Sequence, residues 1–245
     1  MNQKVAMITG GTRGIGFGIA KAFLKEGYRV VLNYRSDEQT AQAAQEELGT
    51  NAFCVQADIT KKEQRSELIE KVEEKWGRMD VLVNNAAIIR MGRSTDVTEE
   101  DFDAVMQCNL YAPIFLSQLF VNWLIENKAP GSIINILSIG AHGAGNISYC
   151  TSKAALLLAT KCMARELAKH QIRVNSISPH GVATKLNQEN RKNNPEAWEK
   201  LIEKIPMRRE ATTEEVAGAA VYLASDTASF TTGIDLPVDG GYLTR

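Results

Sequence analysis

Two residues four positions apart carry the clearest chemical signal in the sequence. Tyr149 and Lys153 lie in residues 148–155, which are predicted to be helical, so their side chains are expected on one helix face. A free tyrosine has a pKa of about 10, whereas acid–base catalysis works best near neutral pH. Lowering that pKa to about 7 requires roughly 4 kcal/mol of preferential stabilisation of the phenolate, which a nearby ammonium group and a positively charged cofactor ring can supply. We therefore predict that Lys153 lowers the pKa of Tyr149 and that Tyr149 transfers a proton.

A hydroxyl group is expected beside this pair. Ser138 follows the apolar run at residues 133–137, which is predicted to be a strand. Ligands bind at the carboxyl ends of the strands in open parallel sheets. Ser138 is therefore predicted to hold a substrate oxygen while Tyr149 moves the proton.

A glycine-rich loop predicts a dinucleotide site. Residues 9–16 read Thr-Gly-Gly-Thr-Arg-Gly-Ile-Gly and lie between the first predicted strand and the first predicted helix. Glycines there permit a tight turn and let backbone N–H groups approach a pyrophosphate, and the helix N-terminus adds its positive dipole end. The spacing differs from the common Gly-x-Gly-x-x-Gly fingerprint, so the position of the loop carries more weight than its pattern.

The end of the second predicted strand indicates which dinucleotide binds. An acidic residue there favours the ribose 2′-hydroxyl of NAD, but this strand ends Asn33-Tyr34-Arg35-Ser36. Arg35, with Arg13 in the glycine loop, is expected to pair with a 2′-phosphate, although both arginines are also compatible with simple solvation. We predict that NADP(H) is favoured and that NAD(H) can also bind.

The pattern of elements predicts a single-domain α/β fold. Short apolar runs, beginning with Val5–Thr9, Arg29–Tyr34, Ala52–Gln56 and Val81–Asn84 and continuing with residues 133–137 and 173–177, alternate with amphipathic helical stretches. This alternation predicts a Rossmann-type, doubly wound parallel sheet with helices on both faces. Thr98 and Thr212 each open a helix, the latter with Glu215 as a capping box. One domain is expected over residues 1–245, and the polar segment 185–194 belongs either to a surface loop or to a substrate lid at about 182–210.

Composition excludes several classes of function. Lys and Arg total 28 and Asp and Glu total 29, so the net charge of -1 gives no basic surface for nucleic acid or an anionic membrane. No signal peptide and no apolar stretch approaching bilayer length is expected. The four cysteines are widely spaced, which favours reduced thiols in a cytoplasm over disulfides or a zinc site. Cys150 is interpreted as an inert thiol rather than a nucleophile, because no fixed His or Asp partner is evident in the sequence.

These signals, in this order, resemble a short-chain dehydrogenase/reductase over essentially the whole chain. The matching features are the loop at residues 9–16, Asp58 after the third predicted strand, Asn84-Asn85-Ala86, Asn109, Ser138, Tyr149-x-x-x-Lys153, and Pro179 after Asn175. Two positions depart from the family pattern. Ala87 replaces the glycine of Asn-Asn-Ala-Gly, and His180 replaces the glycine that follows the proline. His180 is either a polar contact for substrate or a packed side chain.

The resemblance implies a role for each residue. Asn109 would hold a water linking Lys153 to solvent, Ser138 would orient the substrate, Tyr149 would be the general acid or base, and Lys153 would bind the nicotinamide ribose. Asp58 would contact the adenine, Asn84 and Ala86 would flank the cofactor, and Val182 and Thr184 would hold the carboxamide. The alternatives are purely structural: a turn cap for Asp58, a helix kink for Asn109 and an N-cap for Thr184. No metal is implied, and a homotetramer is expected. The full predicted nucleotide-binding set is Gly10, Thr12, Arg13, Gly14, Ile15, Gly16, Asn33, Tyr34, Arg35, Ser36, Asp58, Ile59, Asn85, Ala86, Ala87, Tyr149, Lys153, Pro179, Val182 and Thr184.

The substrate is the least determined part of the prediction. His142, Asn146, Ile147 and His180 are the expected pocket residues, with Ile89 and Arg90 near them. The chain resembles both 3-oxoacyl-[acyl-carrier-protein] reductases and glucose or polyol dehydrogenases, and a 3-oxoacyl thioester or related small keto compound ranks slightly ahead. A carrier-bound substrate would need a basic docking patch, for which Arg90, Arg93 and Lys128 are candidates. A nucleotide-binding protein without turnover is the remaining alternative, disfavoured because the complete catalytic set is present.

Overall fold

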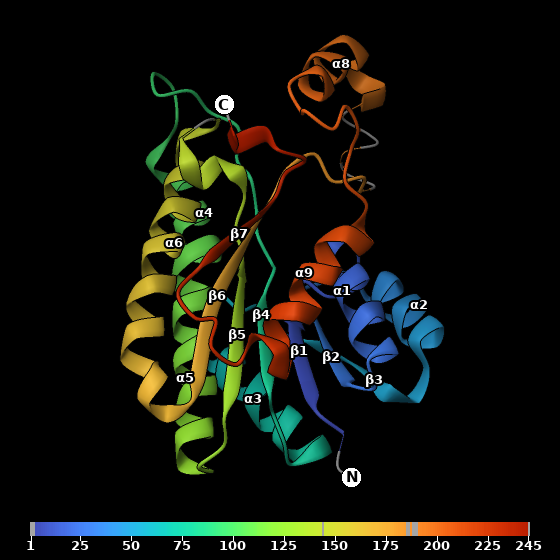
Figure 1. Ribbon diagram of the computed structural model, residues 1–245, viewed down its shortest axis with the longest axis vertical. Coiled ribbons are helices and arrows are strands. Elements are labelled where there is room, and N and C mark those ends of the chain that lie inside the picture. Colours follow the sequence, from blue (N-terminus) through green and yellow to red (C-terminus); the bar gives the residue numbers. More distant parts are fainter. Residues whose placement is uncertain (1–2, 144, 185–186, 188–190, 245) are drawn as a thin grey trace.

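The fold is a single seven-stranded sheet with helices on both faces. The computed structural model describes residues 3–143, 145–184, 187 and 191–244. All strands are parallel and lie in the order β3-β2-β1-β4-β5-β6-β7 (Figure 1). They are β1 Val5–Thr9, β2 Arg29–Tyr34, β3 Ala52–Gln56, β4 Val81–Asn84, β5 Gly131–Ile136, β6 Ile172–Pro179 and β7 Asp235–Val238. The predicted doubly wound parallel sheet in one domain is confirmed.

Two helical layers enclose the sheet. One layer contains α1 (Gly14–Lys25), α2 (Glu38–Leu48) and α9 (Thr213–Ala224), and the other contains α3 (Lys62–Trp76), α4 (Glu99–Met106), α5 (Ala112–Glu126) and α6 (Ile147–Leu167) (Figure 1). Each layer buries its own apolar core, one centred on Phe23 of α1 and the other on Phe120 of α5. The central strands between them are buried on both faces, which explains why β1 is fully buried along its length. The helix α8 (Pro195–Glu203) lies apart from these layers.

The reversal of strand order creates the crevice in which a ligand can bind. From β1 the sheet grows outward through β2 and β3 on one side and through β4 to β7 on the other. The connections after β1 and β4 therefore diverge at the carboxyl edge, which is where open α/β sheets bind their ligands. The glycine loop, Ser138 and the segments after β4 and β6 all follow strands that end at this edge.

Most predicted elements are confirmed, and the exceptions have local causes. The first four strands have the predicted bounds, and the Thr212–Glu215 capping box is present. The strand β7 was missed, because its four residues include Pro237 and lie half-exposed at the sheet edge. No apolar stretch approaching bilayer length was expected from the sequence, and this was wrong, since the helical run Glu99–Glu126 is long and apolar enough to cross a membrane. Half of its most apolar window is buried within the protein, as in the core helix of a globular fold.

The contact between α1 and α9 depends on a glycine. A Cβ built on Gly18 would lie 2.8 Å from the Cβ of Thr213, closer than real Cβ contacts. Gly218, on the other helix, has no atom within 4 Å of the corresponding position. We predict that Gly18→Ala lowers the free energy of unfolding by about 1–3 kcal/mol through overpacking. Gly218→Ala, the matched control, should raise it by about 0.5–1 kcal/mol through helix propensity. Urea unfolding of both variants measures this, and equal effects would contradict the assigned packing.

Candidate active site

The glycine loop has the geometry of a phosphate cradle. Gly10 and Gly14 adopt φ values of +59° and +56°, which favour glycine. A Cβ on Gly16 would lie 2.5 Å from the Gly10 carbonyl oxygen, so any side chain there would force the loop open. Thr12 is buried, while Arg13 is exposed immediately before α1. The half-buried Ile15 packs against the core beside α1. The loop thus presents backbone rather than side chains at the start of a helix, which suits a pyrophosphate.

Asn85 and Thr9 hold this loop against the end of β4. The Asn85 amide donates to the carbonyl oxygens of Thr9 at 2.9 Å and Gly10 at 3.0 Å. The Thr9 hydroxyl accepts from the backbone N–H groups of Asn85 and Ala86, both at 3.0 Å. Asn85 was predicted to bind the cofactor directly, but its side chain braces the loop that would bind it. Thr9 was missed as a functional residue, although a threonine closing an apolar strand was a visible signal.

Two further residues predicted to contact nucleotide have their side chains occupied within the protein. The buried Asn33 amide donates to the Ala57 carbonyl oxygen at 2.8 Å and so joins the ends of β2 and β3. The Asp58 carboxylate accepts from the Thr60 backbone N–H at 3.0 Å and its hydroxyl at 2.7 Å. The alternative that Asp58 caps a turn is therefore observed. Its neighbour Ile59 is 5% exposed and lies in the core.

The chain after β2 places the positively charged side chain of Arg35 where a ligand can reach it. Tyr34 is half-buried, whereas Arg35 and Ser36 are exposed. Burial raises the pKa of Cys108, and the charges of Lys153 and Arg35 both act to lower it. The two cations therefore lie within electrostatic range of one thiol, although they come from opposite halves of the sheet.

The segment after β6 closes the other side of the crevice. Pro179 ends the strand, and the buried Val182 pairs with Ala211 in an isolated parallel bridge. Thr184 accepts a hydrogen bond from the Asn187 backbone N–H, and its methyl group is 3.7 Å from a Cβ built on Gly14. The segment after β6 thus faces the glycine loop. Together with the half-buried Ala86 and the exposed Ala87 after β4, these residues fit a dinucleotide laid along the carboxyl edge.

Tyr149, Lys153 and Ser138 are assembled as the sequence predicted. Tyr149 and Lys153 lie in α6, and the Lys153 ammonium lies 5.6 Å from the centroid of the Tyr149 ring. Lys153 is 2% exposed, and its Nζ donates to the Ile136 carbonyl oxygen at 2.7 Å. Ser138 follows β5, and its hydroxyl is hydrogen-bonded to Tyr149. The three polar groups therefore meet at the carboxyl ends of the central strands.

The protonation of the pair differs from the prediction. Burial raises the pKa of Tyr149 to about 12, and the hydrogen bond from Ser138 only partly offsets it. The predicted lowering is thus wrong for the protein alone, because desolvation of the phenolate outweighs the hydrogen bond from Ser138. Burial lowers the pKa of Lys153 to about 8. Tyr149 is consequently a neutral phenol at pH 7, and Lys153 is mostly cationic.

Asn109 acts here as a brace. It lies in the π-helical turn Gln107–Tyr111 between α4 and α5 and is fully buried. Its Oδ1 accepts from the Ile88 backbone N–H at 2.9 Å, and its Nδ2 donates to the Ile88 carbonyl oxygen at 2.9 Å and to Ser152 Oγ at 3.2 Å. Both amide hydrogens are therefore used in tying the loop after β4 to α6. The predicted water-binding role of Asn109 stays a prediction.

Two of the predicted substrate residues instead anchor the segment before α6. The Oδ1 of Asn146 accepts from the Tyr149 backbone N–H at 3.1 Å as the N-cap of α6, and its Nδ2 donates to the Arg90 carbonyl oxygen at 2.7 Å. His142 Nε2 lies 2.8 Å from the Asp235 carboxylate on β7. Ile147, at the first position of α6, is 37% exposed. His142 and Ile147 are both exposed, and the predicted contacts of all three residues with substrate stay predictions.

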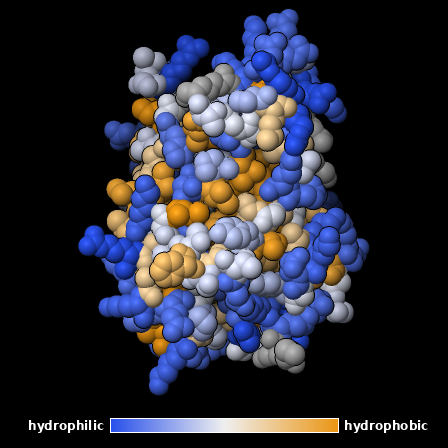
Figure 2. Space-filling model, in the orientation of Figure 1, coloured by the Kyte–Doolittle hydropathy of each residue, from blue (hydrophilic) through white to orange (hydrophobic). Residues whose placement is uncertain are grey.

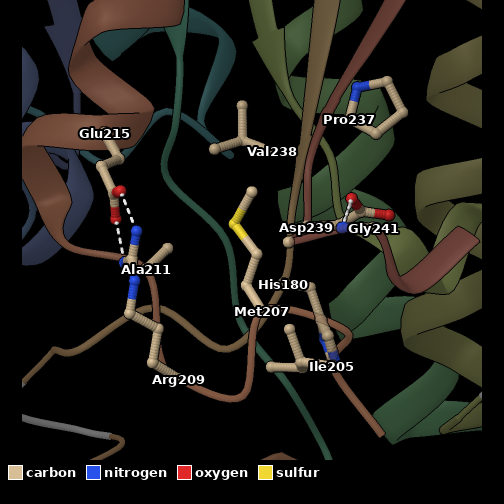
Figure 3. A pocket seen from close by; sticks show the side chains of 11 residues that line it. His180, Ile205, Met207, Arg209, Ala211, Glu215, Pro237, Val238, Asp239 and Gly241 are labelled. Carbon is tan, nitrogen blue, oxygen red and sulfur yellow. Dashed lines mark hydrogen bonds and ion pairs between the residues drawn. The ribbon is translucent and has the colours of Figure 1, made fainter.

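The fourth, His180, lines a pocket at the edge of the sheet. Its ring packs against Tyr242 with centroids 4.3 Å apart and planes inclined at 54°, so the interpretation as a packed side chain is observed. The pocket has a volume of about 330 Å³ (Figure 3). Arg209 and Glu215 form a two-point ion pair on one side of it, and Ile205 and Asp239 lie on the other. Tyr149 and Ser138 are not among its lining residues, so this pocket is separate from the proton-transfer pair.

The predicted basic docking patch is not a single patch. Arg90 is exposed in the loop after β4 and lies 3.8 Å from Asp101. Arg93 belongs to the same loop, near the carboxyl edge of the sheet. Lys128 lies between the end of α5 and the start of β5, at the opposite, amino edge. The inclusion of Lys128 was therefore wrong, because sequence distance does not show which edge of the sheet a loop occupies.

The cysteines have the environment of structural thiols. Burial raises the pKa of Cys54, Cys108 and Cys150, which keeps these thiols protonated and unreactive at neutral pH. Among the described residues, no group of three or more His, Cys, Asp or Glu side chains could hold a metal ion.

A doubly wound sheet with a glycine-rich first turn, joined to a serine–tyrosine–lysine constellation, defines a nicotinamide-dependent oxidoreductase. A model of the family described as Enoyl-(Acyl carrier protein) reductase matches residues 10–243. The chain belongs to the short-chain dehydrogenase/reductase family, whose members act on CH–OH and C=O groups.

Relatives with different printed activities match the chain over nearly its full length. It is 36% identical to galactitol 2-dehydrogenase of Agrobacterium fabrum (strain C58 / ATCC 33970), with 98% of each chain covered. It is 35% identical to glucose 1-dehydrogenase 2 of Bacillus subtilis (strain 168), over 98% of this chain and 95% of the relative. It is 37% identical to the 3-oxoacyl-[acyl-carrier-protein] reductase FabG of Thermotoga maritima, with 98% of each chain covered.

Solved structures show the same fold with either cofactor. ElxO with NADP bound has a TM-score of 0.92 at 32% identity, covering 99% of this chain and 100% of that chain. The 3-ketoacyl-(acyl-carrier-protein) reductase of Brucella melitensis, complexed with NADH, has a TM-score of 0.89 at 33% identity, with 98% of each chain covered. The family binds NAD(P)(H), and these two structures leave the preference of this chain open.

The lowered pKa of Lys153 gives a stability prediction with a definite sign. Between about pH 8 and pH 10.5, Lys153 carries its ammonium proton in the unfolded chain but not in the folded protein. The free energy of unfolding therefore rises with pH across that window. The gain from this group is up to about 3 kcal/mol. We predict that urea unfolding of the protein without cofactor shows this rise, that Lys153→Met lacks it, and that Lys161→Met, an exposed control on the same helix, retains it. A Lys153→Met variant with the wild-type pH dependence would rule out the buried cation.

Proposed function

We propose that this protein is an NADP(H)-dependent oxidoreductase that interconverts a carbonyl and a secondary alcohol, with Tyr149 as general acid and base. The proposal rests on one observation. The buried Lys153 ammonium lies next to the ring of Tyr149, whose hydroxyl is hydrogen-bonded to Ser138. This arrangement lies at the same edge of the sheet as the glycine cradle.

Each residue has a distinct part in the reaction. When bound, the nicotinamide supplies the hydride for reduction and accepts it in the reverse direction. Ser138 holds the substrate oxygen, and Tyr149 donates its proton to that oxygen as negative charge develops. With a pKa of about 12 in the free protein, Tyr149 holds its proton until an alkoxide-like oxygen forms. The Lys153 cation stabilises the phenolate that remains, and the low dielectric of its site strengthens that interaction.

Residues that do not touch the substrate keep this geometry fixed. Asn146 caps α6 at Tyr149, and Asn109 ties Ser152 of the same helix to the loop after β4. Gly10, Gly14 and Gly16 would hold the pyrophosphate through backbone N–H groups, and Thr184 would close over the opposite side of the cofactor. Arg13 and Arg35 would pair with a 2′-phosphate, which is the basis for favouring NADP(H).

A 3-oxoacyl thioester or related small keto compound is the proposed substrate, and a sugar or polyol is the alternative. The Thermotoga maritima relative supports the first, and the description of the matched family model also refers to an acyl carrier protein. The galactitol and glucose dehydrogenases support the second at similar identity. Arg90 and Arg93, in the loop after β4, are the remaining candidates to contact an acidic carrier protein.

The proposal includes a lid and an oligomer. Trp198, Leu201 and Ile202 of α8 are only half-buried, and Figure 2 shows apolar side chains on the face of the molecule below the largely charged surface of this helix. These features support the proposed lid at about 182–210, of which residues 185, 186 and 188–190 lie outside the described part. Exposed Tyr111, Phe115 and Leu158, on the α5–α6 side, support association into a homotetramer.

A spectrophotometric panel tests the proposed reaction. Acetoacetyl thioesters, simple diketones, glucose and several polyols are supplied with each cofactor, and NADPH absorbance is followed. We expect turnover with at least one substrate and a loss of at least about a hundredfold in kcat for Tyr149→Phe, because the general acid is removed. Tyr28→Phe, which removes the hydroxyl of a tyrosine outside the site, is the matched control and should keep wild-type kcat. Full activity of Tyr149→Phe would reject the mechanism, and NADPH binding without any turnover would favour a non-catalytic role.

The cofactor preference is tested at Arg35. Arg35→Asp replaces a cation that would meet the 2′-phosphate with an anion that repels it and can accept from a ribose hydroxyl. We expect the ratio of kcat/KM for NADPH over NADH to fall by about a hundredfold, equivalent to two tenfold steps of about 1.4 kcal/mol each. Arg29→Asp, at the other end of β2, should leave the ratio unchanged. An unchanged ratio in Arg35→Asp would show that this arginine is only solvated.

A further inference from the structure

A hydrogen-bonded cluster beside the active site involves a residue that sequence analysis did not select. The Asp235 carboxylate, on edge strand β7, has 10% of its side chain exposed. It accepts from the hydroxyls of Ser176 at 2.7 Å and Ser178 at 2.8 Å, both on β6. Its third partner is His142 Nε2 at 2.8 Å, from the 3₁₀ turn Ile139–His142. Because an ionised carboxylate only accepts, His142 is the donor in this contact.

His142 belongs to the connection between β5 and α6, which begins at Ser138 and leads to Tyr149, the two residues whose hydroxyls are hydrogen-bonded to each other. This connection begins at Ser138, passes through the turn Ile139–His142, and enters α6 just before Tyr149. Gly143 and Gly145 follow His142 with φ values of 115° and 131°, a conformation that costs glycine little. A connection between a strand and a helix needs fixed points if it is to hold two side chains in register.

The fixed points are three side chains spaced along it. At its start, the Ser138 hydroxyl accepts from the Gly140 backbone N–H at 3.1 Å. At its end, Asn146 Nδ2 donates to the Arg90 carbonyl oxygen. The His142–Asp235 contact is the middle one, and it fastens the turn to β7, which is itself paired with β6.

We infer that His142 and Asp235 are positioning residues that set the Ser138 hydroxyl against the Tyr149 hydroxyl by clamping the β5–α6 connection to the edge strand. This inference rests on the proposed function, since the geometry it protects is that of the proton transfer. His142 therefore acts through Ser138 rather than as the substrate contact predicted from sequence. The two serines of β6 hold the carboxylate in place, so the clamp joins β5, β6 and β7 at one point.

Cys150 provides a readout that needs no catalysis. Its Sγ lies 3.0 Å from a Cβ built on Gly140 and 3.1 Å from one built on Gly145, so the connection packs over this thiol. Loosening the clamp should expose Cys150 to alkylation. Iodoacetamide labelling, quantified at the peptide containing Cys150 by mass spectrometry, would then report the state of the connection directly.

The test compares the full-length protein with variants at both ends of the contact. His142→Ala removes the histidine end of the clamp, Asp235→Asn removes the negative charge and one acceptor oxygen from the other end, and the double variant combines both changes. His142→Gln keeps an N–H donor close to the Nε2 position, and His170→Ala replaces an exposed histidine after α6 as the control. For each variant we measure kcat, the Kd of NADPH by fluorescence, and the rate of Cys150 labelling.

We expect His142→Ala to lower kcat about tenfold, as a small misplacement of reacting groups does, with the NADPH Kd unchanged within about twofold. Cys150 labelling should accelerate about fivefold as the connection opens more often. Asp235→Asn should show the same pattern, the double variant should be no worse than either single variant, and His142→Gln should recover most of kcat. If His142→Ala fails to fold, Asp235→Asn still tests the loss of the contact, and His142→Gln still tests whether a replacement donor preserves it.

Distinct outcomes overturn the inference. Unchanged kcat and labelling in His142→Ala would show that the contact positions nothing. A fall in kcat that Asp235→Asn does not share would make His142 a direct substrate contact. A wild-type protein that reduces no carbonyl would instead defeat the proposed function, while the labelling rates would still decide whether the clamp exists.

Discussion

The burial of one lysine ammonium beneath the carboxyl edge of the sheet is the constraint on which the site depends. A buried cation is costly, and here the Ile136 carbonyl oxygen accepts a hydrogen bond from it. The cost appears in the lowered pKa of Lys153, and the same desolvation raises the pKa of Tyr149. The protein thus keeps a neutral phenol beside a cation in a site of low dielectric. In the proposed reaction, a developing negative charge on a substrate oxygen favours both the transfer of the phenol proton and the retention of the cation.

Lys153 and Tyr149 keep this arrangement only if the structure around them is rigid, and the parallel sheet provides that rigidity. The central strands are buried on both faces, so their carboxyl ends cannot shift without disturbing two packed cores. Loops that leave these ends are then joined to one another by side chains. Asn85 links β4 to the glycine loop, Asn109 links the loop after β4 to α6, and Asp235 links β7 to the turn after Ser138. The cofactor crevice and the proton-transfer pair are fixed by the same edge.

Several polar residues near the crevice take part in this bracing through their side chains. Asn33, Asn85 and Asn146 were all predicted to contact cofactor or substrate, yet each makes hydrogen bonds to backbone groups of neighbouring segments. The bracing role of each was not predicted, for one reason in every case, and their contacts with cofactor or substrate stay predictions. A short amide side chain at the end of a strand can satisfy a ligand or satisfy exposed backbone, and the choice depends on neighbours that are distant in sequence.

The sequence by itself determined the order of strands and helices, the glycine loop, and the positions of Ser138, Tyr149 and Lys153 along the chain. Periodicity and turn chemistry are local properties, so they can be recognised without coordinates. Only the tertiary structure decided the edge strand β7, the opposite placement of Lys128 and Arg90, and the direction in which the Tyr149 pKa moves. Each of these depends on burial or on contacts between residues far apart in the chain. Desolvation in particular is set by everything packed around a group, and a spacing of four residues on a helix does not specify it.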